Sequence, residues 1–305
     1  MVNGAKRSNS EIIEMVNRTF IPGSEWVYFK IYTGTNTADD ILKNEMYGYV
    51  SEMFKRRVID KWFFIRYFDP DFHIRIRIHL KETRDFYHVF NRFFETFNPL
   101  VKSEIVWNIQ CDTYQREMER YGFNSISLAE DLFFVDSEFV IKLIIQLAQR
   151  NDEQQRWKLA LVMIDSFLSV FSYDLQQRKE LLHEMAESLK KEFGFMNHAT
   201  KKQLDEKYRA HRKEIENAML WNNPINETFG IIQERKQTIF PVAMILTSME
   251  NSGKLQVPLN ELLKSIQHMN MNRWFRTKNR LHELVIYDFL SRYYTSEIAK
   301  TNKIL

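Results

Sequence analysis

The sequence predicts an α+β fold, in which a ferredoxin-like antiparallel sheet in the first third is packed against a larger helical body. Before residue 114, segments rich in aromatic and β-branched residues alternate with segments of helical periodicity in the order βαββαβ. After residue 114 the apolar residues recur mainly at helical spacing, and no obvious linker intervenes. We therefore expect an N-terminal arm over 1–25 and one domain over 26–305, with a sheet-containing part (26–114) and a mainly helical part (115–305).

Each element follows from its local pattern. Runs of aromatic and branched residues predict strands, and apolar residues three or four apart predict helices. The sheet-containing part is expected to hold a strand at 26–34, a helix at 36–56, a hairpin of strands at 62–68 and 73–80, a helix at 83–98 and a strand at 104–114. The expected helical segments of the second part are 126–150, 153–171, 175–195, 199–220, 237–251 and 258–294.

Composition narrows the functional classes. The chain has 305 residues, of which 44% are apolar and 27% charged, and its net charge is +3. Basic residues are nearly balanced by acidic ones, so nucleic-acid binding is weakly supported. The single cysteine, Cys111, excludes an internal disulfide and a multi-cysteine zinc site. No signal peptide or membrane span is recognisable, so the sequence predicts a cytoplasmic protein.

The stretch HIRIRIHL, residues 73–80, carries the clearest functional signal. In a strand, His73, Arg75, Arg77 and His79 share one face, and apolar side chains share the other. A solvated sheet face is the simpler interpretation, but a row of basic residues without Asp or Glu repels itself. We therefore expect a negative partner opposite it, either carboxylates of the same chain or an anionic ligand held by arginine forks. Arg66, on the neighbouring strand, is a further candidate.

Two other stretches contain candidate residues. If YQREMERYG (114–122) is a helix, Glu117 and Arg120 lie one turn apart, with Tyr114 on the preceding turn. This pair is either a surface ion pair of little energetic value or a glutamate that orients a functional arginine. In AEDLFFVDSEF (129–139), Asp136 or Ser137 is expected to cap an apolar helix.

The last candidate is His268 in SIQHMNMNRWF (265–275), where Asn272 follows one helical turn later. A helical histidine is usually structural, yet histidine is the commonest general acid or base near neutral pH. The eight histidines show no convincing metal spacing, and there is no glycine-rich phosphate loop. We therefore expect neither a metal nor a cofactor.

Taken together, these stretches resemble a known family. WFFIRYFDPDFHIRIRI, YQREMERYG, AEDLFFVDS and HMNMNR, in this order, are similar to the thiopeptide-type bacteriocin biosynthesis domain, from about Trp26 to Tyr294. That domain is the C-terminal, glutamate-eliminating part of class I lanthipeptide dehydratases. The large glutamylation domain of the full-length enzymes has no counterpart here, so the chain resembles the elimination component of a split dehydratase. Phe123, Asn270 and Trp274 depart from the residues that the family usually has.

The resemblance implies a lyase. Its substrate would be a precursor peptide whose serine and threonine residues have been glutamylated, and its products dehydroalanine and dehydrobutyrine. The catalytic residues implied by motif are Arg75, Arg77, Glu117, Arg120 and His268, and the supporting substrate-binding candidates are Arg66, His73, Asn272 and Arg273. The implied partners are that peptide and a separate tRNA-dependent glutamylating component; whether the chain also forms a homodimer is left open.

Two alternatives remain open at this point. One is a thiopeptide cyclase that joins two dehydroamino acids into a pyridine by a formal aza-[4+2] addition. Such cyclases tend to depart from the H-x-R-x-R and H-M motifs, so the motifs favour elimination. The other is a non-catalytic module that binds an acidic peptide or a partner enzyme through the same basic face. Direct nucleic-acid binding ranks below all three.

Overall fold

The computed structural model describes residues 16–220 and 227–302, so only part of the predicted arm (1–25) is covered. The first third forms a four-stranded antiparallel sheet of β2 (Trp26–Thr33), β3 (Ile59–Phe68), β4 (Phe72–Leu80) and β5 (Val106–Asp112). Its strand order is β3-β4-β2-β5. The predicted α+β class and the antiparallel sheet are confirmed.

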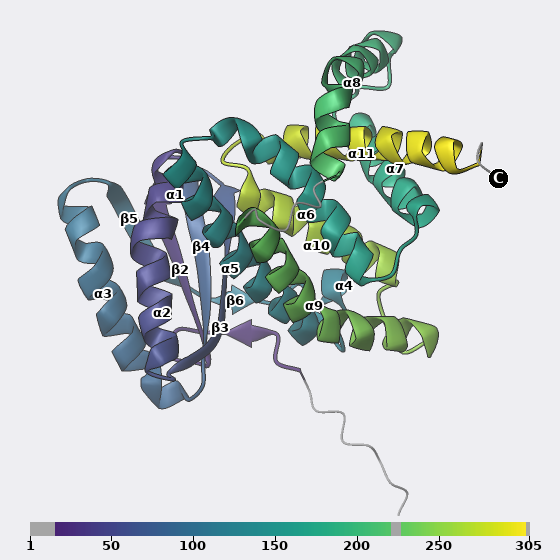
Figure 1. The fold of residues 1–305 in the computed structure, drawn as a ribbon. Coiled ribbons are helices and arrows are strands. Elements are labelled where there is room, and N and C mark those ends of the chain that lie inside the picture. Colours follow the sequence, from purple (N-terminus) through teal and green to yellow (C-terminus); the bar gives the residue numbers. More distant parts are fainter. Residues whose placement is uncertain (1–15, 221–226, 303–305) are drawn as a thin grey trace, which may run out of the picture.

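The helical segments that connect the strands cover one face of the sheet. The segment between β2 and β3 forms α1 (Thr37–Asp40), a π-helical stretch η1 (Ile41–Met46) and α2 (Tyr47–Lys55). Between β4 and β5 lie η2 (Thr83–Asp85) and α3 (Phe86–Lys102). Phe29 of β2 stacks on Phe93 of α3 with ring centroids 3.7 Å apart, which packs α3 against this face of the sheet (Figure 1).

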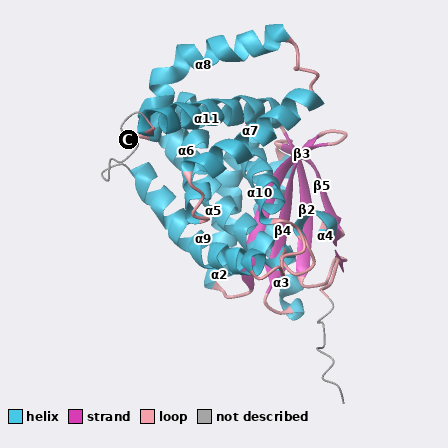
Figure 2. Cartoon of the chain, turned by 90° about the vertical axis from the view of Figure 1, so that its right-hand side faces the viewer, coloured by secondary structure: helices cyan, strands magenta, loops and turns pink. Residues whose placement is uncertain are grey.

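The helical body lies on the other side of the sheet, so the sheet is enclosed between two helical layers (Figures 1 and 2). Helix α8 lies on the outside of this body. The elements of the body are α4 (Met118–Tyr121), α5 (Ile126–Arg150), η3 (Glu153–Gln155), α6 (Arg156–Val170), α7 (Leu175–Glu192), α8 (His198–Met219), α9 (Glu227–Asn251), α10 (Leu259–Trp274) and α11 (Asn279–Thr301).

A second, two-stranded pairing ties the N-terminal segment to the domain. Strand β1 (Thr19–Phe20) pairs antiparallel with β6 (Tyr114–Gln115). Phe20 is buried and stacks on Tyr114, with ring centroids 5.8 Å apart. No periodic pattern predicts this pairing, because two residues are too few to show alternation.

The outer edge of β3 is closed by side chains of the helical body. The Asn272 amide of α10 accepts a hydrogen bond from the Arg66 backbone N–H and donates one to the Arg66 carbonyl, both at 2.8 Å. The Ser137 hydroxyl of α5 accepts from the Phe64 N–H at 3.2 Å. These contacts satisfy backbone groups that an open edge strand would expose, and they fix α10 against the sheet.

Candidate active site

Strand β4 has the two unlike faces that its alternation predicts. Ile74, Ile76 and Ile78 are fully buried on the face that looks toward α2 and α3. On the opposite face, the four basic residues differ in their charge and in the groups that they contact. His79 contacts the Asp60 carboxylate through Nδ1 at 2.6 Å, which supplies one of the expected negative partners.

His73 begins this row of basic residues, and its imidazole is neutral at neutral pH. Burial lowers the pKa of its imidazole. Its Nδ1 lies 2.9 Å from the Asp71 carbonyl oxygen, and its Nε2 lies 3.1 Å from Arg75 Nε. A carbonyl can only accept, so Nδ1 carries the proton and Nε2 accepts from Arg75. The neutral ring therefore orients Arg75 instead of repelling it.

The two arginines of β4 are held by aromatic rings. The Arg75 guanidinium lies 3.3 Å from the centre of the Tyr67 ring. The Arg77 guanidinium lies 4.5 Å from the Tyr28 ring and 4.9 Å from the Tyr114 ring. Among residues 16–220 and 227–302, no carboxylate lies within ion-pair distance of either arginine, and Arg77 Nε has no hydrogen-bond partner. Ring faces hold these cations and leave their donor edges available to an anion.

Glu117 and Arg120 meet, although the predicted helix over 114–122 is mostly absent. Tyr114 lies in strand β6, and only the single turn α4 is helical, so the expectation of Tyr114 on the preceding helical turn is wrong. Gly122 ends this turn with φ +75°, and a Cβ there would lie 2.7 Å from the Ser125 hydroxyl oxygen. Arg120 contacts Glu117 at 3.3 Å, and both side chains are largely exposed.

His268 is fixed by a buried glutamate. Its Nδ1 lies 2.9 and 3.0 Å from the two carboxylate oxygens of Glu283, which is fully buried on α11. The Tyr287 hydroxyl and Arg280 Nη1 each donate to the same carboxylate at 3.3 Å. Arg280 Nη1 is also 3.3 Å from His268 Nδ1, but the shorter carboxylate contacts place the ring proton on Nδ1. In the neutral ring, His268 Nε2 is then the nitrogen that can accept a proton.

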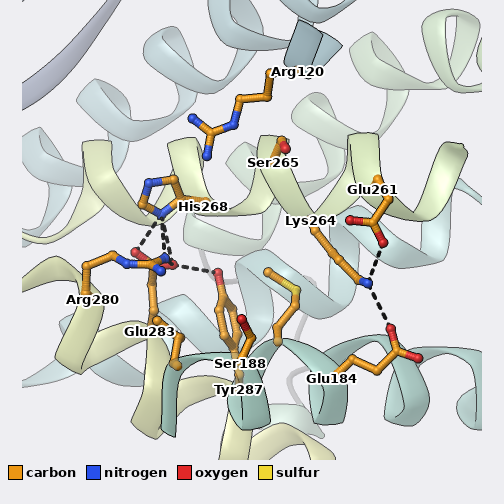
Figure 3. A pocket seen from close by; sticks show the side chains of 12 residues that line it. Arg120, Glu184, Ser188, Glu261, Lys264, Ser265, His268, Arg280, Glu283 and Tyr287 are labelled. Carbon is orange, nitrogen blue, oxygen red and sulfur yellow. Dashed lines mark hydrogen bonds and ion pairs between the residues drawn. The ribbon is translucent and has the colours of Figure 1, made fainter. Parts of the chain in front are cut away.

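A cavity of about 270 Å³ lies in front of His268, between α4, α7, α10 and α11. Arg120 projects into it from α4, opposite His268, Arg280 and Glu283 (Figure 3). Lys264, also on its wall, is paired with Glu184 at 2.8 Å and Glu261 at 2.7 Å. The cavity therefore offers positive and negative groups side by side, as a zwitterionic ligand requires.

A second, much smaller cavity of about 30 Å³ borders the polar face of the sheet. Arg77, Glu117, Tyr121 and Arg273 are among the residues that line it. Since Glu117 lines this cavity and its ion-pair partner Arg120 lines the larger one, the two cavities are neighbours. The structure thus brings Arg77, Glu117, Arg120, Arg273 and His268 to one region, whereas Arg75 lies farther along β4 and lines neither cavity.

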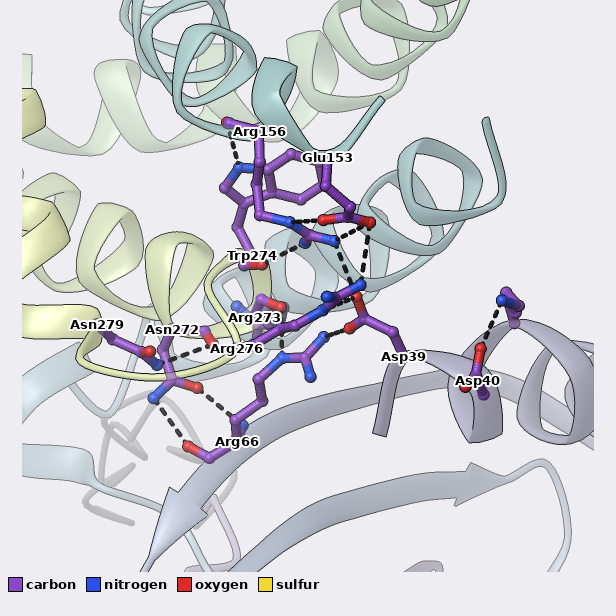
Figure 4. Close-up of polar contacts among 11 residues, drawn as sticks. Asp39, Asp40, Arg66, Glu153, Arg156, Asn272, Arg273, Trp274, Arg276 and Asn279 are labelled. Atoms are coloured by element: carbon purple, nitrogen blue, oxygen red, sulfur yellow. Dashed lines mark hydrogen bonds and ion pairs between the residues drawn. The ribbon is translucent and has the colours of Figure 1, made fainter. Parts of the chain in front are cut away.

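Arg66 and Asn272 belong to a buried junction between the sheet and the helical body (Figure 4). Arg66 is 2% exposed, and its guanidinium binds Asp39 at 2.5 Å and the Arg273 carbonyl at 2.9 Å. Asp39 also accepts from Arg156 at 2.8 Å and Arg276 at 2.6 Å. Burial alone would raise the pKa of the Asp39 carboxyl, but the three guanidinium groups outweigh it and hold the pKa below its usual value. These contacts position α10.

Two buried carboxylates of α5 were not identified as such from the sequence. Asp136 and Ser137 were expected to cap a helix, but both lie inside α5, ten or more residues after its start, so that prediction is wrong. Asp136 accepts two hydrogen bonds from Arg235, at 2.9 and 2.6 Å. The fully buried Glu130 accepts from Arg116 and Tyr114. A carboxylate on the apolar stripe of a helix was the signal that could have revealed both.

The described residues, 16–220 and 227–302, contain neither a metal-binding cluster nor a helix that could span a membrane. No group of three or more His, Cys, Asp or Glu side chains is arranged to hold a metal ion there. In the same residues, every helix is too short or too polar to cross a membrane.

Comparison with solved structures places the fold. The tRNA-dependent lantibiotic dehydratase MibB from Microbispora sp. 107891 superimposes with a TM-score of 0.74 at 15% identity, over 92% of this chain and 29% of that chain. The pyridine synthase TbtD from thiomuracin biosynthesis superimposes with a TM-score of 0.62 at 13% identity, over 90% and 99% of the two chains. The fold is therefore one that a lantibiotic dehydratase and a pyridine synthase share.

Sequence comparison then identifies the family. Residues 26–294 match the family described as lantibiotic biosynthesis dehydratase C-term. The nisin biosynthesis protein NisB of Lactococcus lactis subsp. lactis is 25% identical over 93% of this chain, and the subtilin biosynthesis protein SpaB of Bacillus subtilis is 22% identical over 99% of it. The chain spans only 27% and 28% of the lengths of these two relatives. The chain belongs to the lantibiotic dehydratase C-terminal family, which confirms the resemblance drawn from its motifs.

Proposed function

We propose that this protein is a lyase that eliminates glutamate from glutamylated serine and threonine residues of a ribosomal precursor peptide, leaving dehydroalanine and dehydrobutyrine. The observation that carries the proposal is that cationic groups able to bind an anion lie close to a histidine able to act as a base. Arg77 of β4, which has no carboxylate partner among the described residues, lines the smaller cavity, and His268 of α10, oriented by the buried Glu283, lines the larger cavity beside it. Family membership supports the same reaction.

The proposed reaction is a β-elimination. A base removes the Cα proton, and the electron pair moves into the neighbouring carbonyl group, whose oxygen becomes negatively charged. The pair then returns to form the Cα–Cβ double bond as the Cβ–O bond breaks, and glutamate leaves with the bonding electrons. The reaction is redox-neutral, so it needs no electron acceptor. One well-placed donor at a developing oxyanion accelerates such a step by about 10²–10³.

His268 is proposed as the base at Cα. Its Nδ1–H donates to Glu283, so Nε2 is free to accept a proton. The leaving group is a carboxylate, whose conjugate acid has a pKa of about 3.3–3.7, so it departs without help from an acid. The proton transfer that needs catalysis is therefore the one from Cα, where a positioned base contributes about 10²–10⁴ in rate.

The larger cavity is proposed to hold the glutamyl group. A glutamyl ester carries an ammonium and a carboxylate, and this cavity combines Arg120 and Arg280 with Glu184 and Glu261. Its volume of about 270 Å³ suits an amino-acid-sized ligand, because pockets for drug-sized ligands begin at about 300 Å³. Arg75 is proposed to bind a second anionic point of the peptide at the entrance along β4.

Pyridine formation is the second candidate, because the pyridine synthase TbtD has the same fold and nearly the same extent. Retention of Arg75, Arg77 and His268 favours elimination over it. We also propose that the sheet is of the ferredoxin-like type, since the order β3-β4-β2-β5 with two helical connections on one face supports that topology.

The proposed partner is a separate glutamylating component. In the relatives this domain is a quarter or so of a longer chain, which supports a contact between this domain and another part of the dehydratase. Exposed apolar side chains on α3 and around the start of β5, an edge strand of the sheet, suit such a contact; they are Tyr87, Phe94, Ile105 and Trp107. Co-purification of the two proteins tests the association, and Trp107→Lys should reduce it without lowering elimination by the protein alone.

One peptide with a glutamyl ester on a single threonine tests the reaction. The protein alone should convert it to the dehydrobutyrine peptide with release of free glutamate, followed by mass spectrometry. Arg75→Ala and His268→Ala should each lose at least 100-fold in turnover, whereas Arg212→Ala, a substitution of an exposed arginine on α8, should match the wild type. Failure of the wild type to release glutamate, even with the glutamylating component present, refutes the proposal.

A further inference from the structure

The smaller cavity is lined by an arginine that forms no ion pair or hydrogen bond through its guanidinium group within the described residues. Arg273 is fully buried at the end of α10, and its Nε, Nη1 and Nη2 all lack hydrogen-bond partners. Arg77, on the other wall, is 9% exposed, and its Nε is also without a partner. Two guanidinium groups from distant parts of the chain thus present unused donors to the same small space.

Each of these cations is held in place by aromatic rings. The Arg273 guanidinium lies 4.9 Å from the Phe133 ring, and Arg77 lies between the rings of Tyr28 and Tyr114. A ring face stabilises a cation without using its N–H groups. The donors of Arg273 are therefore immobilised before a ligand arrives, which is what transition-state stabilisation requires.

No group in the described residues forms an ion pair or hydrogen bond with the Arg273 guanidinium. Asp136 favours its charged form from a distance, but Asp136 Oδ1 accepts from Arg235, and its buried Oδ2 has no hydrogen-bond partner. Burial lowers the pKa of Arg273 to about 10, so the side chain is still a cation at neutral pH. Burial also raises the pKa of Tyr121, on the same wall, to about 12, so this phenol is neutral and supplies no counter-charge.

The size of the cavity limits its ligand. Its volume of about 30 Å³ exceeds the roughly 10–15 Å³ that one water needs and is far below the 270 Å³ of the larger cavity, so it admits an oxygen-sized group and not a whole glutamyl group. An unpaired buried cation is costly, and in native proteins such an exception calls for an explanation. A single negatively charged oxygen that is present only during reaction would provide one.

We propose that Arg273, together with Arg77, binds the peptide carbonyl oxygen of the residue undergoing elimination and stabilises the negative charge that this oxygen acquires when the Cα proton is removed. The proposal rests on the proposed elimination and adds a residue to it. His268 and Met269 are consecutive on α10 and line the larger and the smaller cavity respectively. The reacting Cα–Cβ bond would then lie between the two cavities, with the glutamyl group on one side and the carbonyl oxygen on the other.

Arg273→Met is the decisive variant, because methionine keeps much of the length of the chain and removes the charge. With the threonyl ester peptide, we expect kcat to fall at least 100-fold and KM to change less than threefold, since the oxygen is charged only in the transition state. Arg273→Lys should recover part of kcat. Arg212→Met, in exposed helix α8, is the matched control and should stay within twofold of the wild type.

The thermal stability of Arg273→Met distinguishes a role in catalysis from a role in holding the fold together. If Arg273 has no protein partner, Arg273→Met removes an uncompensated buried charge, and Tm should stay the same or rise. A variant with full kcat, or one that loses Tm and kcat together, overturns the proposal.

A second measurement keeps the site testable if the wild type shows no turnover, which would refute the proposed function by itself. At constant ionic strength, replacing gluconate by chloride should raise Tm of the wild type but not of Arg273→Met, because only the small anion fits the cavity. No chloride effect on the wild type refutes the anion site.

Discussion

Asp39→Asn should destabilise the junction that holds α10 against the sheet. Asp39 is 2% exposed and accepts hydrogen bonds from Arg66, Arg156 and Arg276 at 2.5, 2.8 and 2.6 Å. Asparagine is nearly the same shape, but it removes the only negative charge that Arg66 contacts within ion-pair distance in the described residues. The substitution therefore leaves a buried cation uncompensated, which typically costs about 3–5 kcal/mol.

The expected loss can be measured by thermal unfolding. In a chain of this size 1 kcal/mol corresponds to about 2 °C, so Tm should fall by about 6–10 °C. The matched control is Asp205→Asn on α8, where the carboxylate is partly exposed and contacts Arg292 at 2.5 Å; its Tm should change by less than about 2 °C. A Tm for Asp39→Asn within 2 °C of the wild type would refute the view that this junction depends on charge pairing.

The Asp39 carboxylate should also make the free energy of unfolding depend on pH in the acid range. Its pKa is lower in the folded protein than in the unfolded chain, so its contribution is complete above the unfolded value of about 3.9 and is lost as pH falls through the folded value. Unfolding measured between pH 5 and pH 2.5 should therefore show a smaller acid-induced loss in Asp39→Asn than in the wild type. Equal slopes for the two proteins would contradict this assignment.

Three further predictions concern the site. Glu283→Gln keeps the shape of the carboxylate but removes its charge from His268, so turnover should fall by about 10²-fold or more, and full activity would exclude a positioning role. Glu117→Gln breaks an exposed ion pair worth at most about 1 kcal/mol, so Tm should hardly move; a tenfold loss of turnover at unchanged Tm would then show that Glu117 orients Arg120, and unchanged turnover would dismiss that role. His73→Gln keeps an acceptor for Arg75 whereas His73→Leu does not, so the leucine variant should lose more kcat/KM, and equal losses in the two variants would contradict this role.

Alternation and helical periodicity were enough to predict the sheet and most helices, because each reports the side of an element that is buried. The expected helix 126–150 has the same bounds as α5, and the two faces of β4 are as expected. Periodicity failed at α4, where one helical turn between a short strand and Gly122 is too brief to show a period. It also failed at Asp136, since a capping pattern and a buried carboxylate look alike in one dimension.

The sequence by itself determined the fold class, the family and the residues worth testing, because these depend on local spacing and on motif order. Only the tertiary structure decided which of those residues share a space. It placed Arg66 and Asn272 in the junction behind α10, gave His268 its buried partner Glu283, and left Arg273 facing Arg77. Such assignments depend on contacts between residues 206 positions apart, as in Arg66 and Asn272, and no local pattern encodes whether a charged side chain meets an opposite charge, a ring face or an empty cavity.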